Sequence, residues 1–233
     1  MKFLLLDTET NGLPKNRFAP ASQWEMFPAI LQLSWALYEL QGRQLKRIRG
    51  EDSGVALHRT IPWDEGAAKI HGISEIEGRY GIPAAVALAN LAVALRETDV
   101  VVAHNLSFDK AVLRAAGYAE AHRDPECRPL RTLWPSTGLQ GFCTMEMGRE
   151  LLKIPLPSDP TSGKWKAPKL NELYTWLYGH VYDMSGAVLH TAKSDMHCLE
   201  QCINGLFRRG ILKPAEPAET RQITYAASSP ASA

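Results

Sequence analysis

Two carboxylates stand two positions apart where an apolar run near the N-terminus ends. The run from Lys2 to Leu6 is followed by Asp7, Thr8 and Glu9, and Asn11-Gly12 then supplies a turn. Strand side chains alternate between faces, so a strand here places Asp7 and Glu9 on one face and turns Thr8 away. Two acids side by side repel each other unless a cation lies between them. The spacing therefore predicts a metal-binding position at the end of a buried strand.

Two further segments each place an acid beside the predicted start of a helix. One runs from His104 to Asp109, and the other from His190 to Asp195. Because His190 and Asp195 are five positions apart, on one continuous helix their side chains would point about 140° apart. We therefore expect His190 in the loop before the helix, Thr191 as a cap, and Asp195 in the first turn, where the helix dipole favours an anion. The chain thus offers four carboxylates and one histidine for a site.

The elements that must position these residues begin with antiparallel strands. Ile30 to Tyr38 alternates as a strand does, and Gly42 makes a turn. Arg43 to Arg49 and Val55 to Arg59 are expected to form the next strand or hairpin, interrupted by a loop at Glu51 to Gly54.

The middle of the chain predicts helices around another buried strand. A short helix, a long helix and a strand are expected at Asp64 to Ile70, Pro83 to Glu97 and Asp99 to Ala103. Ser107 then caps a helix that runs to Ala116 and stops at Gly117, with Asp109 in its first turn.

The last part of the chain is less regular. Tyr118 to Gly141 has no predicted element, and the expected strand and helices that follow are Phe142 to Thr144, a helix through Lys153, Lys169 to Tyr178, and Ala192 to Arg209. Beyond Pro214 the chain has too few large apolar side chains for their burial to offset the conformational entropy lost on ordering. We expect one α/β domain over residues 1–212 and a disordered Pro/Ala/Ser-rich tail over residues 213–233.

Composition restricts the class of protein. The net charge of +1 gives no global field that would attract a polyanion, so any nucleic-acid binding must be local. The four cysteines form no CxxC pair, no signal-like apolar stretch follows the N-terminus, and no run approaches the ~20 apolar residues that span a bilayer. We expect a cytoplasmic protein with free thiols that does not insert into a membrane.

The three acidic segments resemble the motifs of the DEDDh branch of the DnaQ-like 3′→5′ exonucleases. The resemblance rests on Asp-x-Glu in the first strand, His-Asn-x-x-Phe-Asp in the middle, and a histidine followed five positions later by an aspartate, over about residues 1–210. His71 to Ser74 is also similar to the family's His-Gly-Ile-(Thr/Ser) loop, and Cys143 to Met145 to its next strand-to-helix junction. The resemblance implies an α/β, ribonuclease-H-like fold, with a mixed central sheet flanked by helices and the acids at one edge.

The same resemblance assigns roles to the acids and the histidine. It implies that two divalent ions are held by four carboxylates, Asp7, Glu9, Asp109 and Asp195, and that His190 is the general base. Carboxylate ligands select Mg²⁺ or Mn²⁺ over zinc, and two such ions ~3.5–4 Å apart can activate a water and stabilise a leaving oxygen. A histidine with a pKa near ~6.5 can take the proton from that water, while Glu9 helps to hold it.

The resemblance also suggests residues that touch the substrate. In the family, the turn after the first strand approaches the last nucleotide, which implies contacts from Thr10, Gly12 and Leu13, with Leu13 wedged near the terminal bases. His71 either lines the pocket of the terminal nucleotide or packs beneath its own turn. Among other substrate-binding candidates, Asn105 orients its loop, and Phe108 either stacks on a base or packs in the core.

The activity that follows is metal-dependent hydrolysis of the terminal phosphodiester at a nucleic-acid 3′ end, with release of a nucleoside 5′-monophosphate. The Asp-Thr-Glu-Thr form favours DNA over RNA, and single-stranded or frayed 3′ ends are the expected substrate. A 3′→5′ exoribonuclease is the near alternative, and a non-catalytic nucleic-acid-binding or polymerase-associated module the distant one. A polymerase or repair complex is a candidate partner.

Overall fold

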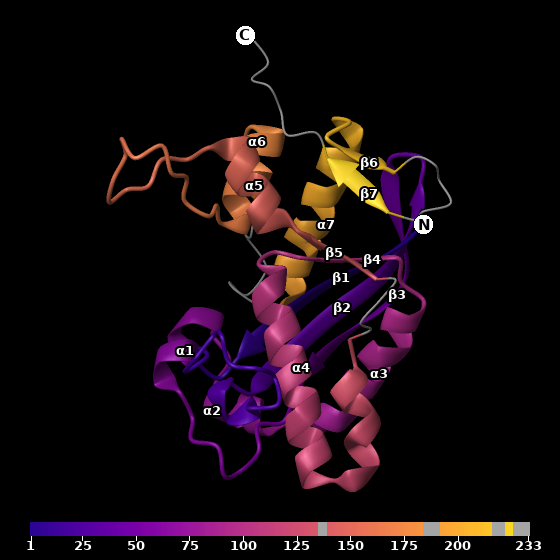
Figure 1. Cartoon of the computed structure of the whole chain (residues 1–233), viewed down its shortest axis with the longest axis vertical. Coiled ribbons are helices and arrows are strands. Elements are labelled where there is room, and N and C mark those ends of the chain that lie inside the picture. Colours follow the sequence, from indigo (N-terminus) through magenta and orange to yellow (C-terminus); the bar gives the residue numbers. More distant parts are fainter. Residues whose placement is uncertain (135–138, 184–191, 216–221, 226–233) are drawn as a thin grey trace.

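The computed structural model of the protein describes residues 1–134, 139–183, 192–215 and 222–225 (Figure 1). Its centre is a five-stranded sheet with the strand order β3-β2-β1-β4-β5. The strands are β1 Lys2–Thr10, β2 Ile30–Gln41, β3 Gln44–Gly54, β4 Val100–Ala103 and β5 Gln140–Cys143. Strands β1, β2 and β3 pair antiparallel, whereas β4 pairs parallel with β1 and with β5. The predicted antiparallel start and mixed central sheet are therefore confirmed.

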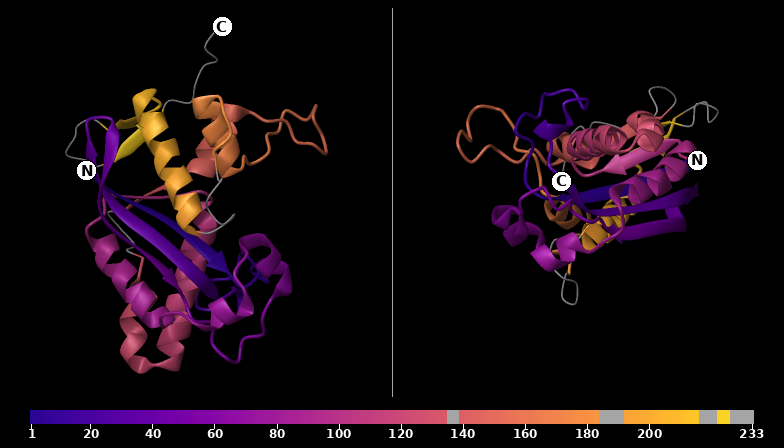
Figure 2. Two further views of the ribbon diagram at one scale, coloured as in Figure 1. Left: turned by 180° about the vertical axis from the view of Figure 1, so that it is seen from behind. Right: turned by 90° about the horizontal axis from the view of Figure 1, so that it is seen from below.

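Helices cover both faces of this sheet, as the view from below shows (Figure 2). The α-helices are α1 Glu65–His71, α2 Glu75–Arg79, α3 Ala84–Arg96, α4 Leu106–Arg123, α5 Thr144–Leu152, α6 Leu170–Tyr178 and α7 Ala192–Arg208, and the 3-10 helices are Trp24–Met26 and Pro125–Thr132. Within the described residues, none of the helices combines the length and the apolar character that crossing a membrane requires.

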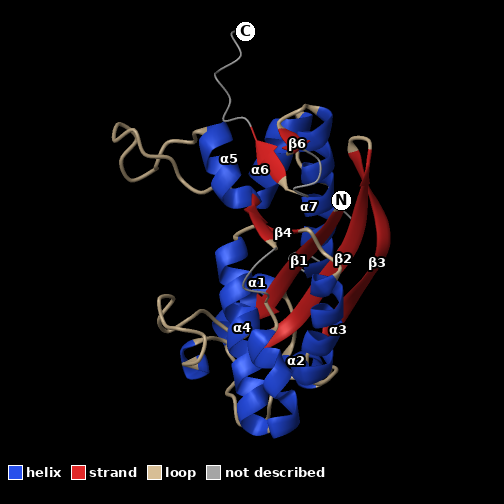
Figure 3. Ribbon diagram, turned by 45° about the vertical axis from the view of Figure 1, so that its right-hand side comes forward, coloured by secondary structure: helices blue, strands red, loops and turns tan. Residues whose placement is uncertain are grey.

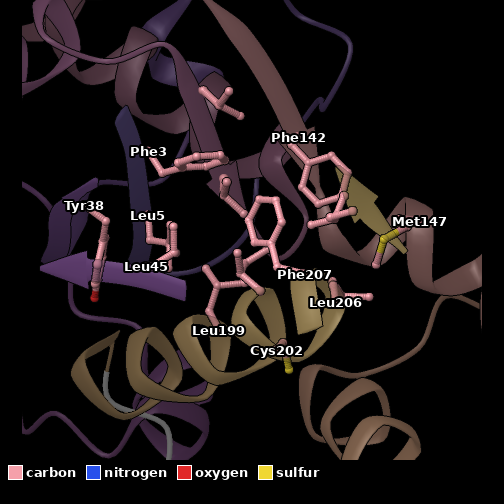
Figure 4. Close-up of a cluster of buried hydrophobic side chains, with 14 of the residues drawn as sticks. Phe3, Leu5, Tyr38, Leu45, Phe142, Met147, Leu199, Cys202, Leu206 and Phe207 are labelled. Carbon is pink, nitrogen blue, oxygen red and sulfur yellow. The ribbon is translucent and has the colours of Figure 1, made fainter. Parts of the chain in front are cut away.

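Strand β1 is buried on both faces because it lies in the middle of the sheet. Phe3 and Leu5 pack towards α7, where Phe3 meets Phe207 edge-on at 5.6 Å between ring centroids (Figure 4). Leu4 and Leu6 pack on the other face towards α3 and α4. This alternation decides that later odd-numbered residues of β1 face α7 and even-numbered ones face α4.

Several local predictions were wrong. Val55 to Arg59 is not a strand, because only Val55 makes an isolated bridge, to Ile82. Strand β3 continues through Glu51 to Gly54, because its backbone pairs with β2 as far as Gln32. Helix α4 does not stop at Gly117 but runs six residues further, to Arg123. Gly117 is instead a point of close approach, since a Cβ there would collide with the carbonyl oxygen of Leu130.

A second, two-stranded sheet lies beside α7 (Figure 3). It pairs β6 Leu212–Pro214 with β7 Ile223–Tyr225. Ile223 is buried, and its backbone exchanges two hydrogen bonds with the side chain of Gln140 on β5. These described residues of the expected tail are thus ordered, because the buried side chain of Ile223 and its two hydrogen bonds with Gln140 attach them to the main sheet.

Candidate active site

Three of the four predicted metal-binding acids meet between β1 and α7. Asp7 and Glu9 are half-buried on the α7 face of β1, and Asp195 lies in the first turn of α7. One carboxylate oxygen from each lies within 4.8 Å of the others. Asp195 stands near the N-terminus of its helix, where the helix dipole favours a negative charge.

Asp109 joins this group from the opposite layer of the fold. It lies in the first turn of α4 and is 2 % exposed. Strand β4 pairs with β1 only as far as Leu5, so the edge of β1 beyond that residue is open to the start of α4. The charge of Asp109 raises the pKa of both Asp7 and Glu9, which places it in the same electrostatic cluster.

Thr8 connects the two layers, a role that no sequence motif assigned to it. Its side chain points away from Asp7 and Glu9, as predicted, and its hydroxyl donates a hydrogen bond of 2.8 Å to Oδ1 of Asp109. The only signal for this role was the position of a hydroxyl side chain between two acids, on the strand face that α4 covers.

The acids of this cluster resist ionising together. Burial raises the pKa of Asp7 well above its usual range, and the charges of Asp109, Asp195 and Glu9 add to the effect. Burial, then Asp195 and Asp109, raise the pKa of Glu9 to about 8. Burial raises the pKa of Asp109 to about 7 against the opposing hydrogen bond from Thr8. Divalent cations would relieve this repulsion, and an all-carboxylate donor set suits Mg²⁺ or Mn²⁺.

The start of α4 is held by a histidine. His104 Nε2 donates to the carbonyl oxygen of Pro168 at 3.0 Å, and Nδ1 then accepts from the hydroxyl of Thr144, also at 3.0 Å. Asn105 takes a left-handed conformation at φ 74° as the N-cap, and Ser107, which was expected to cap the helix, donates to its side chain. Both His104 and Asn105 thus orient the loop that leads into α4, whose first turn carries Asp109.

The turn after β1 has the shape expected of it. The Thr10 hydroxyl donates to the carbonyl oxygen of Gly12 at 2.8 Å, and Gly12 has φ +108°, which glycine adopts readily. Leu13 is 80 % exposed. A cavity of about 1080 Å³ lies beside this turn, but none of the four acids lines it.

The other two substrate candidates are packed residues. His71 is buried, with Nδ1 accepting from the backbone N–H of Ile73 at 3.0 Å and the ring edge-on to Trp63. Its Nε2 is buried and has no hydrogen-bond partner among the described residues. Phe108 is half-buried against the core between the sheet, α3 and α4, which favours the packing interpretation. The predicted general base His190 and the predicted cap Thr191 lie outside the described residues.

Solved structures share this fold. E. coli exonuclease I in complex with a dA13 oligonucleotide matches with a TM-score of 0.57 and 18% identity, over 88% of this chain and 40% of that chain. The zinc-bound E. coli exonuclease I complex with single-stranded DNA matches with a TM-score of 0.60 and 19% identity, over 89% and 40%. Exonuclease I from Methylocaldum szegediense gives a TM-score of 0.58 and 18% identity over the same shares.

The chain shares its ribonuclease-H-like fold with these exonuclease I structures. This ribonuclease-H-like chain spans about 40% of the length of those exonuclease I chains. No family model and no curated protein matches its sequence. The fold implied by the sequence motifs is confirmed.

Proposed function

We propose that this protein is a metal-dependent 3′→5′ exonuclease that hydrolyses the terminal phosphodiesters of single-stranded or frayed DNA ends and releases nucleoside 5′-monophosphates. The observation that carries this proposal is the convergence of Asp7, Glu9, Asp109 and Asp195 from β1, α4 and α7. Structures of exonuclease I with single-stranded DNA, which share the fold, support DNA as the polymer.

The proposed metal ligands are these four carboxylates. When bound, two Mg²⁺ or Mn²⁺ ions would supply an activated water and stabilise the departing 3′ oxygen. Glu9 is also proposed to help orient that water. His190, five positions before Asp195, is the proposed general base.

The proposed substrate contacts follow from exposure and position. Leu13 projects from the turn that follows the acids of β1, where an apolar side chain can pack against a terminal base. Thr10 and Gly12 shape this turn, and Asn105 stands at the start of α4 beside Asp109. We keep His71 as a proposed contact to the terminal nucleotide, because its buried Nε2–H has no hydrogen-bond partner among the described residues.

The test is a time course on 3′-labelled and 5′-labelled single-stranded DNA and RNA with Mg²⁺, Mn²⁺ or chelator. We expect metal-dependent shortening from the 3′ end, faster on DNA, and its loss in D7A and H190A. The matched control is E39Q, since Glu39 pairs with Lys2 at the opposite end of β1 from the acids. Cleavage that persists in D7A would overturn the site, and faster cleavage of RNA would overturn the polymer preference.

A further inference from the structure

The side chain of Gln32 bridges the strand next to β1 and the helix that carries Asp195. Gln32 lies on β2 directly opposite Glu9 on β1, in the last regular pair before the strand register shifts. Residues opposite one another in a sheet share a face, so the Gln32 side chain points towards α7, as the Glu9 side chain does. Its Oε1 accepts a hydrogen bond of 3.1 Å from the backbone N–H of Ala192, the first residue of α7.

This bond satisfies a helix-end donor from another layer of the fold. The first backbone N–H groups of a helix have no partner within the helix and need an acceptor. Ala192 is fully buried, so water does not reach this part of the helix readily. Gln32 therefore acts as a cap that belongs to the sheet, and it ties the N-terminus of α7 to β2.

Asp52 decides which way the Gln32 amide faces. Gln32 Nε2 donates to Asp52 Oδ1 at 3.0 Å, and the Ser34 hydroxyl donates to the same oxygen at 2.5 Å. A carboxylate only accepts hydrogen bonds, so the amide must present its NH₂ group to Asp52 and its carbonyl oxygen to Ala192. The orientation of Gln32 is thus set by its partners on β2 and β3.

The bond between Gln32 and Ala192 affects the position of Asp195 relative to Asp7 and Glu9. Asp195 lies three residues after Ala192, on the same side of α7, and shares the three-carboxylate group with Asp7 and Glu9. These acids repel each other, which pushes the start of α7 away from β1. The Gln32 bond opposes that movement at the point where the helix begins.

We propose that Gln32 is a positioning residue that holds the N-terminus of α7, and with it Asp195, at the separation from Glu9 that divalent-cation binding requires, and that Asp52 orients its amide. This inference rests on the metal centre of the proposed function. Outer partners that orient metal ligands typically change metal affinity or activity ~10–100-fold when they are removed. We expect an effect of that size on Mn²⁺ affinity and on kcat, with the KM for an oligonucleotide unchanged.

The experiment titrates Mn²⁺ alone into the full chain by calorimetry and compares wild type with Q32L, Q32E and the double variant Q32E/D52N. Q32L lacks both hydrogen bonds and should bind Mn²⁺ ~10–100-fold more weakly. In Q32E the new carboxylate can still accept from the backbone N–H of Ala192, but it faces the carboxylate of Asp52 and has no proton to donate to it. In Q32E/D52N the amide of the new asparagine donates to the new glutamate, so a donor faces an acceptor again. We therefore expect Q32E to be weakened and the double variant to recover most of the wild-type affinity.

The control is Q41L, which changes the same residue type at the far end of the same strand, where Gln41 bonds only to the exposed Glu39 among the contacts described for its side chain. Wild-type affinity in Q32L, an equal loss in Q41L, or a double variant no better than Q32E would each overturn the inference. If Q32L does not fold, the comparison of Q32E with Q32E/D52N decides. A wild-type protein that binds Mn²⁺ but cleaves no polymer would overturn the proposed function and leave this comparison valid.

Discussion

The hydroxyl of Thr8 donates a hydrogen bond to the buried carboxylate of Asp109 across the layer between β1 and α4. The two neighbours of Thr8 in the strand, Asp7 and Glu9, point to the opposite face and meet Asp195. Three consecutive residues of β1 therefore contact acids on both faces of the sheet, Asp109 on one face and Asp195 on the other. This arrangement brings a cluster together from helices that do not lie on the same face.

Replacing Thr8 with valine should destabilise the protein by about 1–3 kcal/mol, because the shape is kept while the buried Asp109 carboxylate loses a donor. Mg²⁺ should also bind more weakly, since Asp109 is no longer held. Chemical denaturation with and without Mg²⁺ measures both effects. T175V is the matched control, because the Thr175 hydroxyl bonds only within α6 among its described contacts. Equal stability of T8V and T175V would contradict the role given to Thr8.

The stability of the metal-free protein should fall as the pH rises towards 8. Folding raises the pKa of Glu9 from 4.5 to about 8 and that of Asp109 from 3.8 to about 7. A carboxyl group whose pKa is raised in the folded state stabilises the fold while protonated. This contribution is complete below the unfolded pKa and is lost as the pH rises through the folded one.

The measurement is the melting temperature in chelator and in saturating Mg²⁺ between pH 4 and 9. Mg²⁺ should raise the melting temperature, and by more at pH 8 than at pH 5, because it binds the ionised form. In E9Q the decline in chelator should be shallower than in wild type. A Mg²⁺ effect that does not change with pH would argue against ionisation of this cluster.

Replacing His104 with alanine should cost about 1–3 kcal/mol of stability, because the hydroxyl of Thr144 loses an acceptor and the carbonyl oxygen of Pro168 loses a donor. Burial lowers the pKa of His104 in the folded protein, so the neutral ring is the form that the fold favours. The stability that His104 contributes is therefore present above the pKa of an unfolded histidine and is lost as the pH falls below that pKa. Thermal unfolding at pH 5 and pH 8 tests this. The exposed His58 provides the control variant H58A, and equal losses in H104A and H58A would count against the prediction.

Replacing Gly117 with alanine should destabilise the fold by about 1–3 kcal/mol, although alanine is the better helix former, because a methyl group has no space beside the Leu130 carbonyl. Urea unfolding of G117A measures the change. G54A is the control, since a Cβ at Gly54 meets only one atom, at 3.9 Å. A G117A protein as stable as wild type would show that the Pro125–Thr132 helix shifts at little cost.

Much of the fold could be read from local patterns. Apolar runs and alternation predicted β1, β2 and β4, and an alanine- and leucine-rich stretch that opens with proline predicted α3, since these patterns are local properties of the chain. The errors lay where tertiary pairing overrode local signals. Glu51 to Gly54 has loop composition, yet the ladder with β2 keeps it in a strand. The unplaced segment after Tyr118 continues α4 and adds a 3-10 helix, because Gly117 permits close packing there.

The candidate site shows the same division. Motifs in the chain were enough to identify the acidic residues, and strand geometry was enough to place Asp7 and Glu9 on one face, because it relates neighbours in the chain. The sequence also indicated that Asp109 and Asp195 begin helices, since helix starts have local signals. That Thr8 holds Asp109 and that Gln32 holds the start of α7 became evident from the packed fold alone. Those contacts join residues 101 and 160 positions apart, and no local pattern encodes which hydroxyl or amide the packing of separate layers brings within bonding distance.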